Sequence, residues 1–178
     1  MTIKARRAAI DQIGMVTTDL DRAVAVWTDR FGVGPWVVYR QVVLNGEYRG
    51  APTRVCMDVA LGYRGTEQIE LIAVRSDTAS PYQDADGRAL TGLHHVAWIV
   101  DDIDAEAAAL ADQGLEPVFF ATNPAVRVIY FADPAEPGIL FELISGATAR
   151  HDHRAGMALA AAWDGTNPVT EIDLSHWA

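Results

Sequence analysis

The hydrophobic and polar positions of this chain follow one pattern twice. Residues 9–33 read AIDQIGMVTTDLDRAVAVWTDRFGV, and residues 92–115 read GLHHVAWIVDDIDAEAAALADQGL. Each stretch opens with a short apolar run that is typical of a strand. After a D-[L/I]-D sequence, it continues into an alanine-rich segment whose apolar residues recur at helical spacing. We therefore predict a strand followed by a helix at the start of each of two repeated units.

Both predicted helices carry matching signals at their ends. Asp19 and Asp102 lie 83 residues apart, and a carboxylate at such a position accepts hydrogen bonds from the free N–H groups of the first helical turn. Gly32 and Gly114 lie 82 residues apart, and glycine readily adopts the left-handed conformation that ends many helices. We predict that one helix runs from Asp19 to Gly32 and the other from Asp102 to Gly114.

Three further strand-like runs follow each helix. They are WVVYRQVVL, TRVCMDVALGY and EQIELIAV in the first unit, and EPVFFAT, VRVIYFAD and ILFELISG in the second. We predict an α+β fold in which two tandem βαβββ modules form a cupped mixed sheet around a shared cleft. The segment LNGEYRGAP has the composition of a turn, and we interpret it as an enlarged loop of the first module.

These elements divide the chain into segments of a single domain, residues 1–178. The first module spans residues 8–75 and the second spans residues 93–146. The polar residues 76–92 join them, and we interpret this linker as a tether rather than a lid. Residues 147–178 lie outside the repeat and form a C-terminal helix and tail.

The C-terminal tail contains two histidines and two tryptophans. His151 and His153 are two residues apart, which places them on different faces of a helix, so we interpret both as surface residues. Trp163 and Trp177 lie in otherwise polar surroundings, which suggests that the tail docks onto the sheet or onto a second subunit. We therefore predict a homodimer.

Composition narrows the classes of partner. The 178 residues hold 14 lysines and arginines against 24 aspartates and glutamates, a formal net charge of −10, which argues against nucleic acid or an anionic membrane surface as the main partner. No apolar run approaches the length of a membrane span. The single cysteine, Cys56, cannot form an intrachain disulfide, which fits a cytoplasmic protein.

Overlaying the two modules brings four polar residues into equivalent positions. Gln12 aligns with His95 on the first strands, and Glu70 aligns with Glu142 in the shared sequence x-[I/F]-E-L-I of the last strands. Because neighbouring residues on a strand point to opposite faces, His95 faces the same interior as Gln12. His94 then faces the other way, and we interpret it as a structural residue.

These four residues suit a metal ion. A charged residue in an apolar strand is costly without a partner, and two inward-facing carboxylates would repel each other. A divalent cation removes both penalties. We predict that Gln12, Glu70, His95 and Glu142 bind one divalent metal, because a mixed nitrogen and oxygen set suits Zn, Ni, Co, Mn or Fe. The alternative is that both glutamates face solvent.

At these residues the sequence resembles the vicinal oxygen chelate superfamily, which includes glyoxalase I, methylmalonyl-CoA epimerase, extradiol dioxygenases and fosfomycin-resistance proteins. The resemblance spans residues 8–146 and rests on IDQIGMVTTDLDRAV, FGVGPW, IELI, LHHVAWIVDDID and FADPAEPGILFELI. The set Gln, Glu, His, Glu resembles that of eukaryotic glyoxalase I. The VGPW stretch and the overall layout resemble the epimerase branch.

The resemblance implies a catalytic role for glutamates. In this superfamily the metal binds a substrate through carbonyl oxygens, and a carboxylate removes a proton from the adjacent carbon. Glu142 is then a ligand and the first candidate base, and Glu70 is the second. The epimerase branch uses a glutamate between its second and third strands, which makes Glu47 a candidate outer base. By its turn-like surroundings, Glu47 reads instead as a solvated charge.

The sequence thus predicts a metal-dependent isomerase, epimerase or lyase of the glyoxalase type, acting on a small carbonyl compound with an apolar or aromatic body. One alternative is a non-catalytic binding protein that sequesters a hydrophobic metabolite or drug. Another is an atypical Fe(II) dioxygenase. The dioxygenase reading is weaker because oxygen activation generally uses two histidines and one carboxylate, and Gln12 stands where one of the histidines would be.

Overall fold

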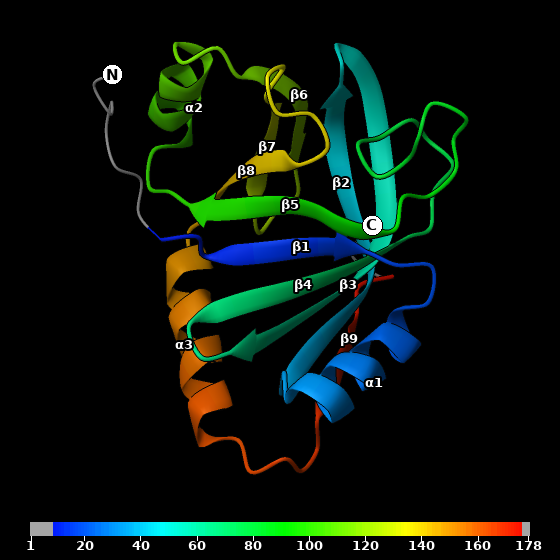
Figure 1. Cartoon of the computed structure of the whole chain (residues 1–178), viewed down its shortest axis with the longest axis vertical. Coiled ribbons are helices and arrows are strands. Elements are labelled where there is room, and N and C mark those ends of the chain that lie inside the picture. Colours follow the sequence, from blue (N-terminus) through cyan, green and yellow to red (C-terminus); the bar gives the residue numbers. More distant parts are fainter. Residues whose placement is uncertain (1–8, 176–178) are drawn as a thin grey trace.

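The computed structural model of the chain describes residues 9–175 and is drawn in Figure 1. In chain order its elements are β1 (Gln12–Val16), α1 (Leu20–Phe31), β2 (Trp36–Tyr48), β3 (Ala51–Arg64), β4 (Glu67–Val74), β5 (Gly92–Ile99), α2 (Ile103–Ala111), β6 (Glu116–Thr122), β7 (Arg127–Ala132), β8 (Leu140–Ser145), α3 (Ala149–Ala162) and β9 (Val169–Asp173). The predicted order of strands and helices is therefore present in both modules.

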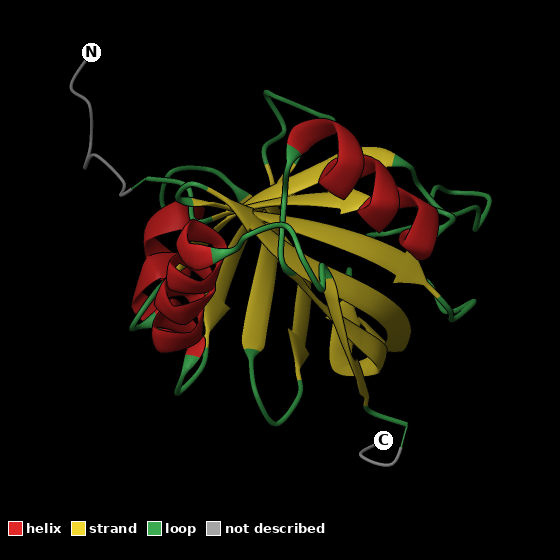
Figure 2. Ribbon diagram, turned by 90° about the horizontal axis from the view of Figure 1, so that it is seen from below, coloured by secondary structure: helices red, strands yellow, loops and turns green. Residues whose placement is uncertain are grey.

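All strands join one mixed sheet in the order β3-β4-β1-β5-β8-β7-β6-β2-β9. Because β2 also pairs with β3, the strands other than β9 close into a ring, and Figure 2 shows them curling into a cup. The pairs β1/β4 and β5/β8 are parallel, and β1 pairs with β5 antiparallel at the centre. The predicted α+β fold with a cupped mixed sheet is confirmed.

The helices α1 and α2 begin as predicted. Asp19 accepts a hydrogen bond from the backbone N–H of Arg22, and Asp102 accepts one from Ala105, both at 3.0 Å. The helix α1 ends at Gly32, whose φ of +63° is left-handed. The helix α2 stops earlier, with Asp112 as its C-cap, so Gly114 belongs to the following turn and the predicted end of this helix is wrong.

Alternation along the strands separates an inner core from two outer ones. Side chains such as Met57, Phe119 and Tyr130 pack together inside the cup. Neighbours with the opposite parity pack under the helices: Leu71 belongs to the core beneath α1, and Leu143 to the core beneath α2. Gln12, Glu70, His95 and Glu142 have the inward-facing parity, so these polar side chains meet on the inner face of the cup.

The segment LNGEYRGAP is not an enlarged loop, contrary to the prediction. Strand β2 continues to Tyr48, and a two-residue turn at Arg49 and Gly50, with φ of +51° and +79°, leads into β3. Gly46 lies within the strand because β6 passes close to it: a Cβ there would lie 1.8 Å from the carbonyl oxygen of Phe120. Glycine marks a close backbone approach at this position, not a turn.

The C-terminal tail docks onto the sheet, as one of the two predicted arrangements proposed. Strand β9 pairs in parallel with β2, and a Cβ at Gly34 would lie 2.9 Å from the ring of Trp163. Trp177 lies outside the described residues. Within the described part of the chain, no helix combines the length and apolar character needed to cross a bilayer.

One prediction for the tail is wrong. His151 is exposed, but His153 is 5% exposed, and its Nε2 lies 3.0 Å from the carbonyl oxygen of Asp11. The Asp11 carboxylate forms an ion pair with Arg150 at 2.5 Å. The helix α3 is therefore fastened to the chain just before β1, through its buried face.

A substitution at Gly46 tests this strand assignment. Gly46→Ala forces a methyl group against the backbone of β6, so we expect the free energy of unfolding to fall by about 1–3 kcal/mol in urea titrations. Asn45→Ala, at the exposed neighbouring position, should change it by about 0.5 kcal/mol or less. A Gly46→Ala variant as stable as the wild type would contradict the assignment of this segment to a strand.

Candidate metal centre

The strand register brings the four predicted site residues together on the inner face. Gly14 of β1 is paired on one side with Glu70 of β4 and on the other with His95 of β5. In the next inward-facing row, Ala97 of β5 is paired with Gln12 of β1 and with Glu142 of β8. Each pair of polar side chains thus flanks a residue with little or no side chain, which leaves room for the polar groups to converge.

Gly14 determines where the imidazole lies. A Cβ at this position would be 1.9 Å from Cε1 of His95 and 2.1 Å from Nε2. The ring therefore occupies the space that any other residue at position 14 would fill. This close approach holds His95 toward β4, where Glu70 is located.

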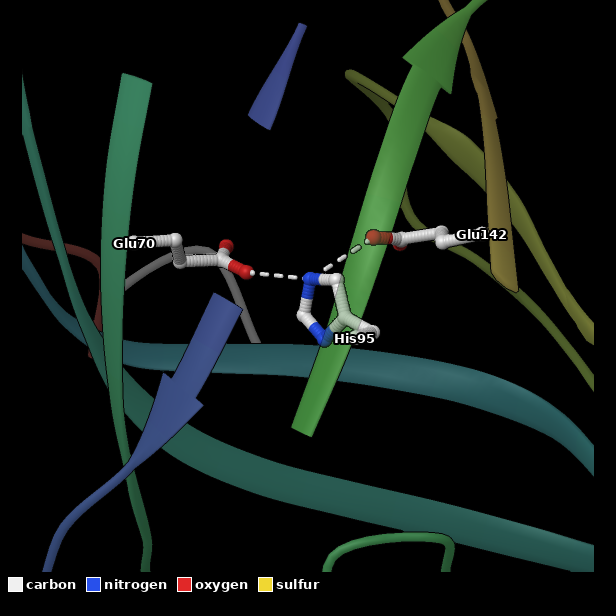
Figure 3. Close-up of side chains that lie close together, drawn as sticks. All are labelled: Glu70, His95 and Glu142. Carbon is white, nitrogen blue, oxygen red and sulfur yellow. Dashed lines mark ion pairs between the residues drawn. The ribbon is translucent and has the colours of Figure 1, made fainter. Parts of the chain in front are cut away.

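A single nitrogen faces three oxygens in this group. The Nε2 of His95 lies 3.1 Å from Oε2 of Glu70 and 3.0 Å from Oε2 of Glu142, as Figure 3 shows. The same nitrogen is 3.3 Å from Oε1 of Gln12. His95 is fully buried and Glu142 is 3% exposed, whereas the side chain of Glu70 is 15% exposed. Glu70 is the member of the group nearest to solvent.

Burial and charge act against each other at these residues. Burial alone would lower the pKa of His95, but the carboxylates of Glu142 and Glu70 raise it to about 10. Burial raises the pKa of Glu142, and the nearby imidazolium counteracts part of that shift. In the metal-free protein, both ring nitrogens of His95 are therefore protonated at neutral pH, and this imidazolium acts as the counter-ion of the glutamates.

The donor atoms fit a divalent cation. The ligand atoms of Glu70, His95 and Glu142 all lie within 4.8 Å of one another. The Oε2 of Glu142 is buried without an aligned hydrogen-bond donor, although Nε2 of His95 is nearby. Such an atom is costly unless a cation or a proton satisfies it. One imidazole nitrogen with several carboxylate and amide oxygens suits Zn, Ni, Co, Mn or Fe.

The amide of Gln12 is oriented by a short hydrogen-bonded chain. Its Nε2 donates to Oε1 of Gln68 at 2.9 Å, and Nε2 of Gln68 donates to the hydroxyl of Tyr63. Because the Gln12 nitrogen is engaged with Gln68, its oxygen is the atom directed at His95. Sequence reasoning did not single out Gln68 or Tyr63, since the contact between them depends on the register of β3 and β4.

Comparison with known proteins supplies the family. The sequence profile described as Glyoxalase/Bleomycin resistance protein/Dioxygenase superfamily matches residues 11–131. The chain belongs to this superfamily. The match includes Gln12, Glu70 and His95, and it ends before Glu142. The resemblance stated from the sequence motifs is thereby confirmed.

Solved structures agree with the superfamily fold. A methylmalonyl-CoA epimerase from Mycobacterium tuberculosis is 22% identical to this chain, with a TM-score of 0.52, and the match covers 80% of this chain and 91% of that one. A hypothetical protein from Bacillus halodurans C-125 is 20% identical, with a TM-score of 0.50 and coverage of 77% and 93%. No curated protein sequence matches the chain significantly. These likenesses show the fold alone.

In this superfamily member His94 does not face away from His95, contrary to the prediction. The pairing of β1 with β5 passes from Gly14↔His95 to Met15↔Leu93, so His94 forms a β-bulge. A bulge interrupts the alternation of side chains along a strand. Both imidazoles consequently pack near Tyr130, and their Nδ1 atoms are 2.9 Å apart. Both ring nitrogens of His94 have hydrogen-bond partners, but the predicted direction of its side chain was wrong.

The linker between the modules packs against His94 beside the centre and is not a simple tether. Ser80, Pro81 and Tyr82 are buried within it, and Tyr82 is 1% exposed. The Tyr82 ring stacks on His94 with centroids 4.9 Å apart, and its hydroxyl lies 3.0 Å from that of Tyr130. The sequence signal for this contact is the proline and tyrosine inside an otherwise polar stretch.

Glu47 does not join this group. It is exposed on β2, where its neighbours Leu44 and Tyr48 turn inward to the core of the cup. Strand alternation therefore directs Glu47 to the outer face. The reading of this residue as a solvated charge describes its position better than the reading as an outer base.

Two cavities lie outside the centre. One, of about 380 Å³, is lined by His94, Pro81, Leu90 and Leu93 among others, and a second, of about 570 Å³, lies beside the same linker. His94 therefore lines the smaller cavity and also contacts His95 through its Nδ1. The four predicted ligands line neither cavity.

The pH dependence of stability tests the charges at the centre. The pKa of His95 rises from 6.5 to about 10 on folding without metal, so its stabilising effect is complete below pH 6.5 and is lost as the pH rises through about 10. The raised pKa of Glu142 acts in the same direction. We expect the urea midpoint, measured with a chelator, to fall across this range. A His95→Gln variant with an equally steep fall would contradict the assignment.

Gly14→Ala tests the space that the imidazole occupies. The added methyl group would collide with the His95 ring, so we expect the free energy of unfolding to fall by about 1–3 kcal/mol and the His95 ring resonances to shift. Ala97→Gly, in the neighbouring row, removes a methyl group without touching this space and should cost about 1 kcal/mol or less. Unchanged ring resonances in Gly14→Ala would show that the His95 ring does not lie against position 14.

Proposed function

We propose that this protein is a metal-dependent isomerase, epimerase or lyase of the glyoxalase type that acts on a small carbonyl compound. The observation that carries the proposal is the convergence of one imidazole, two carboxylates and one amide oxygen in the buried interior of the cup. Membership in the superfamily supports it at the level of the family.

Gln12, Glu70, His95 and Glu142 are the residues that would hold the ion, with Zn, Ni, Co, Mn or Fe as candidates. A divalent cation bound there supplies Lewis-acid polarisation of a substrate carbonyl. The remaining requirements of the reaction fall to the protein: a base of suitable strength, a dry environment and a defined orientation of the substrate.

Glu142 is the preferred base. Burial raises its pKa, which makes the ionised carboxylate a stronger proton acceptor than an exposed glutamate. It would take a proton from the carbon adjacent to the carbonyl, leaving the electron pair of the broken C–H bond delocalised toward the carbonyl oxygen. Return of the proton to the other face of that carbon gives an epimer. Where that carbon bears a hydroxyl group, transfer of the hydroxyl proton to the carbonyl oxygen and return of the first proton to the former carbonyl carbon give an isomer. Glu70 is the second candidate, on the opposite side of His95.

The surroundings favour a substrate with an apolar or aromatic body. Phe119, Tyr130 and Tyr82 form the wall of the cup beside the centre, and Phe119 stacks on Tyr130. Such walls exclude water, which strengthens electrostatic interactions with the reacting atoms. The Tyr82 ring stacks on His94 and adds a further aromatic surface beside the histidines.

The two alternatives make different demands on the same residues. An Fe(II) dioxygenase of the usual type needs two histidines and one carboxylate, and His94 cannot be the second histidine here because both of its ring nitrogens are engaged. A binding protein that sequesters an apolar ligand needs neither the metal nor Glu142. The burial of Tyr82 beside the centre is the observation that favours this second alternative.

The test combines metal analysis with isotope exchange. We expect about one metal ion per chain, by elemental analysis, in protein purified without a metal-binding tag. Glu142→Gln should lower metal affinity by about 10-fold or more and abolish deuterium incorporation into carbonyl substrates in D₂O. Glu116→Gln, an exposed glutamate on β6, is the matched control and should retain both.

Two outcomes would redirect the proposal. Absence of metal from the wild type, even after reconstitution, together with ligand binding by Glu142→Gln would identify a binding protein. If Glu47→Gln keeps its metal but no longer incorporates deuterium into the substrate, Glu47 would be identified as an outer base.

A further inference from the structure

We propose that His94 is a positioning residue that selects the tautomer of His95 and so presents the Nε2 lone pair of His95 to the metal. The proposal rests on the proposed function, because it concerns a ligand of the same ion. The internal repeat does not explain His94, because the equivalent residue of the first module is Asp11 and not a histidine. The proposal gives His94 a role of its own beside His95.

The β-bulge supplies the geometry. Because it breaks the alternation at His94, two consecutive residues place their rings on the same side of the strand. The Nδ1 atoms of His94 and His95 are 2.9 Å apart, and Nε2 of His94 lies 2.8 Å from the carbonyl oxygen of Pro81. Hydrogen bonds therefore connect the carbonyl group of Pro81 to His94, and His94 to His95.

The carbonyl group of Pro81 determines the position of each proton on the two histidine rings. A carbonyl oxygen only accepts hydrogen bonds, so Nε2 of His94 must be the protonated nitrogen. A neutral imidazole has one protonated and one unprotonated nitrogen, so Nδ1 of His94 is then an acceptor. Only one hydrogen fits between the two Nδ1 atoms, and it must belong to His95. The remaining nitrogen of His95, Nε2, is the one that faces Glu70, Glu142 and Gln12.

Packing holds His94 in place. His94 is 5% exposed, and its ring lies between the stacked ring of Tyr82, at 4.9 Å, and the edge-on ring of Tyr130, at 5.7 Å. A buried ring nitrogen without a partner is costly, so neither hydrogen bond is easily given up. Metal-binding histidines commonly use their second nitrogen in this way, and loss of the partner typically lowers metal affinity 10-fold to 100-fold.

Two substitutions at His94 separate positioning from packing. His94→Phe keeps an aromatic ring against Tyr82 and removes both nitrogens. His94→Asn loses the ring but can place an amide oxygen close to the former Nδ1, where it accepts the hydrogen bond from His95. A packing role favours phenylalanine, whereas a positioning role favours asparagine. Circular dichroism and thermal unfolding identify any variant that has lost its fold.

The first measurement is the affinity for Co²⁺ by isothermal titration calorimetry on the full chain. We expect His94→Phe to weaken Co²⁺ binding by about 10-fold or more, and His94→Asn to stay within about 3-fold of the wild type. If the wild type binds Co²⁺ and His94→Phe binds it equally well, the positioning role is overturned while the proposed metal site stands. If the wild type binds no metal, the proposed function falls and this inference with it.

The second measurement needs no variant. Two-bond ¹H–¹⁵N correlation NMR of the Zn²⁺-loaded wild type reports the protonation of each histidine nitrogen. We expect hydrogen on Nδ1 of His95 and on Nε2 of His94. Hydrogen on Nδ1 of His94 would overturn the proposal, whatever the behaviour of the variants.

Discussion

The arrangement of this protein depends on one constraint: a fully buried imidazole lies between two carboxylates. An isolated charge in an apolar interior is strongly unfavourable, and two like charges side by side are worse. Here Nε2 of His95 lies within 3.1 Å of oxygens from both Glu70 and Glu142, so the metal-free protein compensates the glutamates with an imidazolium. A divalent cation can take over this compensation by displacing the proton. Under the proposed function, the cation would take the place of this imidazolium charge between the same two carboxylates.

The duplicated module explains why these groups meet. The central pair β1 and β5 relates the two halves, so that Gln12 corresponds to His95, Gly14 to Ala97 and Glu70 to Glu142. A single module would bring only one of the two carboxylates to this position. Small residues at the centre of each row are as important as the ligands, because the imidazole fills the space above Gly14.

Features that repeat along the chain were predictable, and features that depend on contacts between distant segments were not. The helix caps Asp19 and Asp102 and the four inward polar residues follow from the internal repeat. Gly46 was misread because Asn-Gly signals a turn, whereas the close approach of β6 is a non-local fact. His153 was misread because helical spacing cannot reveal a partner as remote as the carbonyl group of Asp11.

The bulge at His94 shows a further limit of sequence patterns. Strict alternation predicts opposite directions for His94 and His95, and one unpaired residue in the ladder reverses that prediction. Nothing in the local sequence indicates the bulge. Its consequence becomes visible only when the rings, Tyr82 and the carbonyl group of Pro81 are seen together.

The linker between the modules contacts the histidine pair of the candidate metal centre. The carbonyl oxygen of Pro81 accepts the hydrogen bond from His94, and the next residue, Tyr82, stacks on the His94 ring. Displacement of Tyr82 would therefore act on a segment whose adjacent carbonyl group orders His94. A single two-residue stretch thus fixes one ring nitrogen of His94 and packs against the face of the same ring. This requirement for buried contacts explains why an otherwise polar linker contains a proline and a tyrosine in sequence.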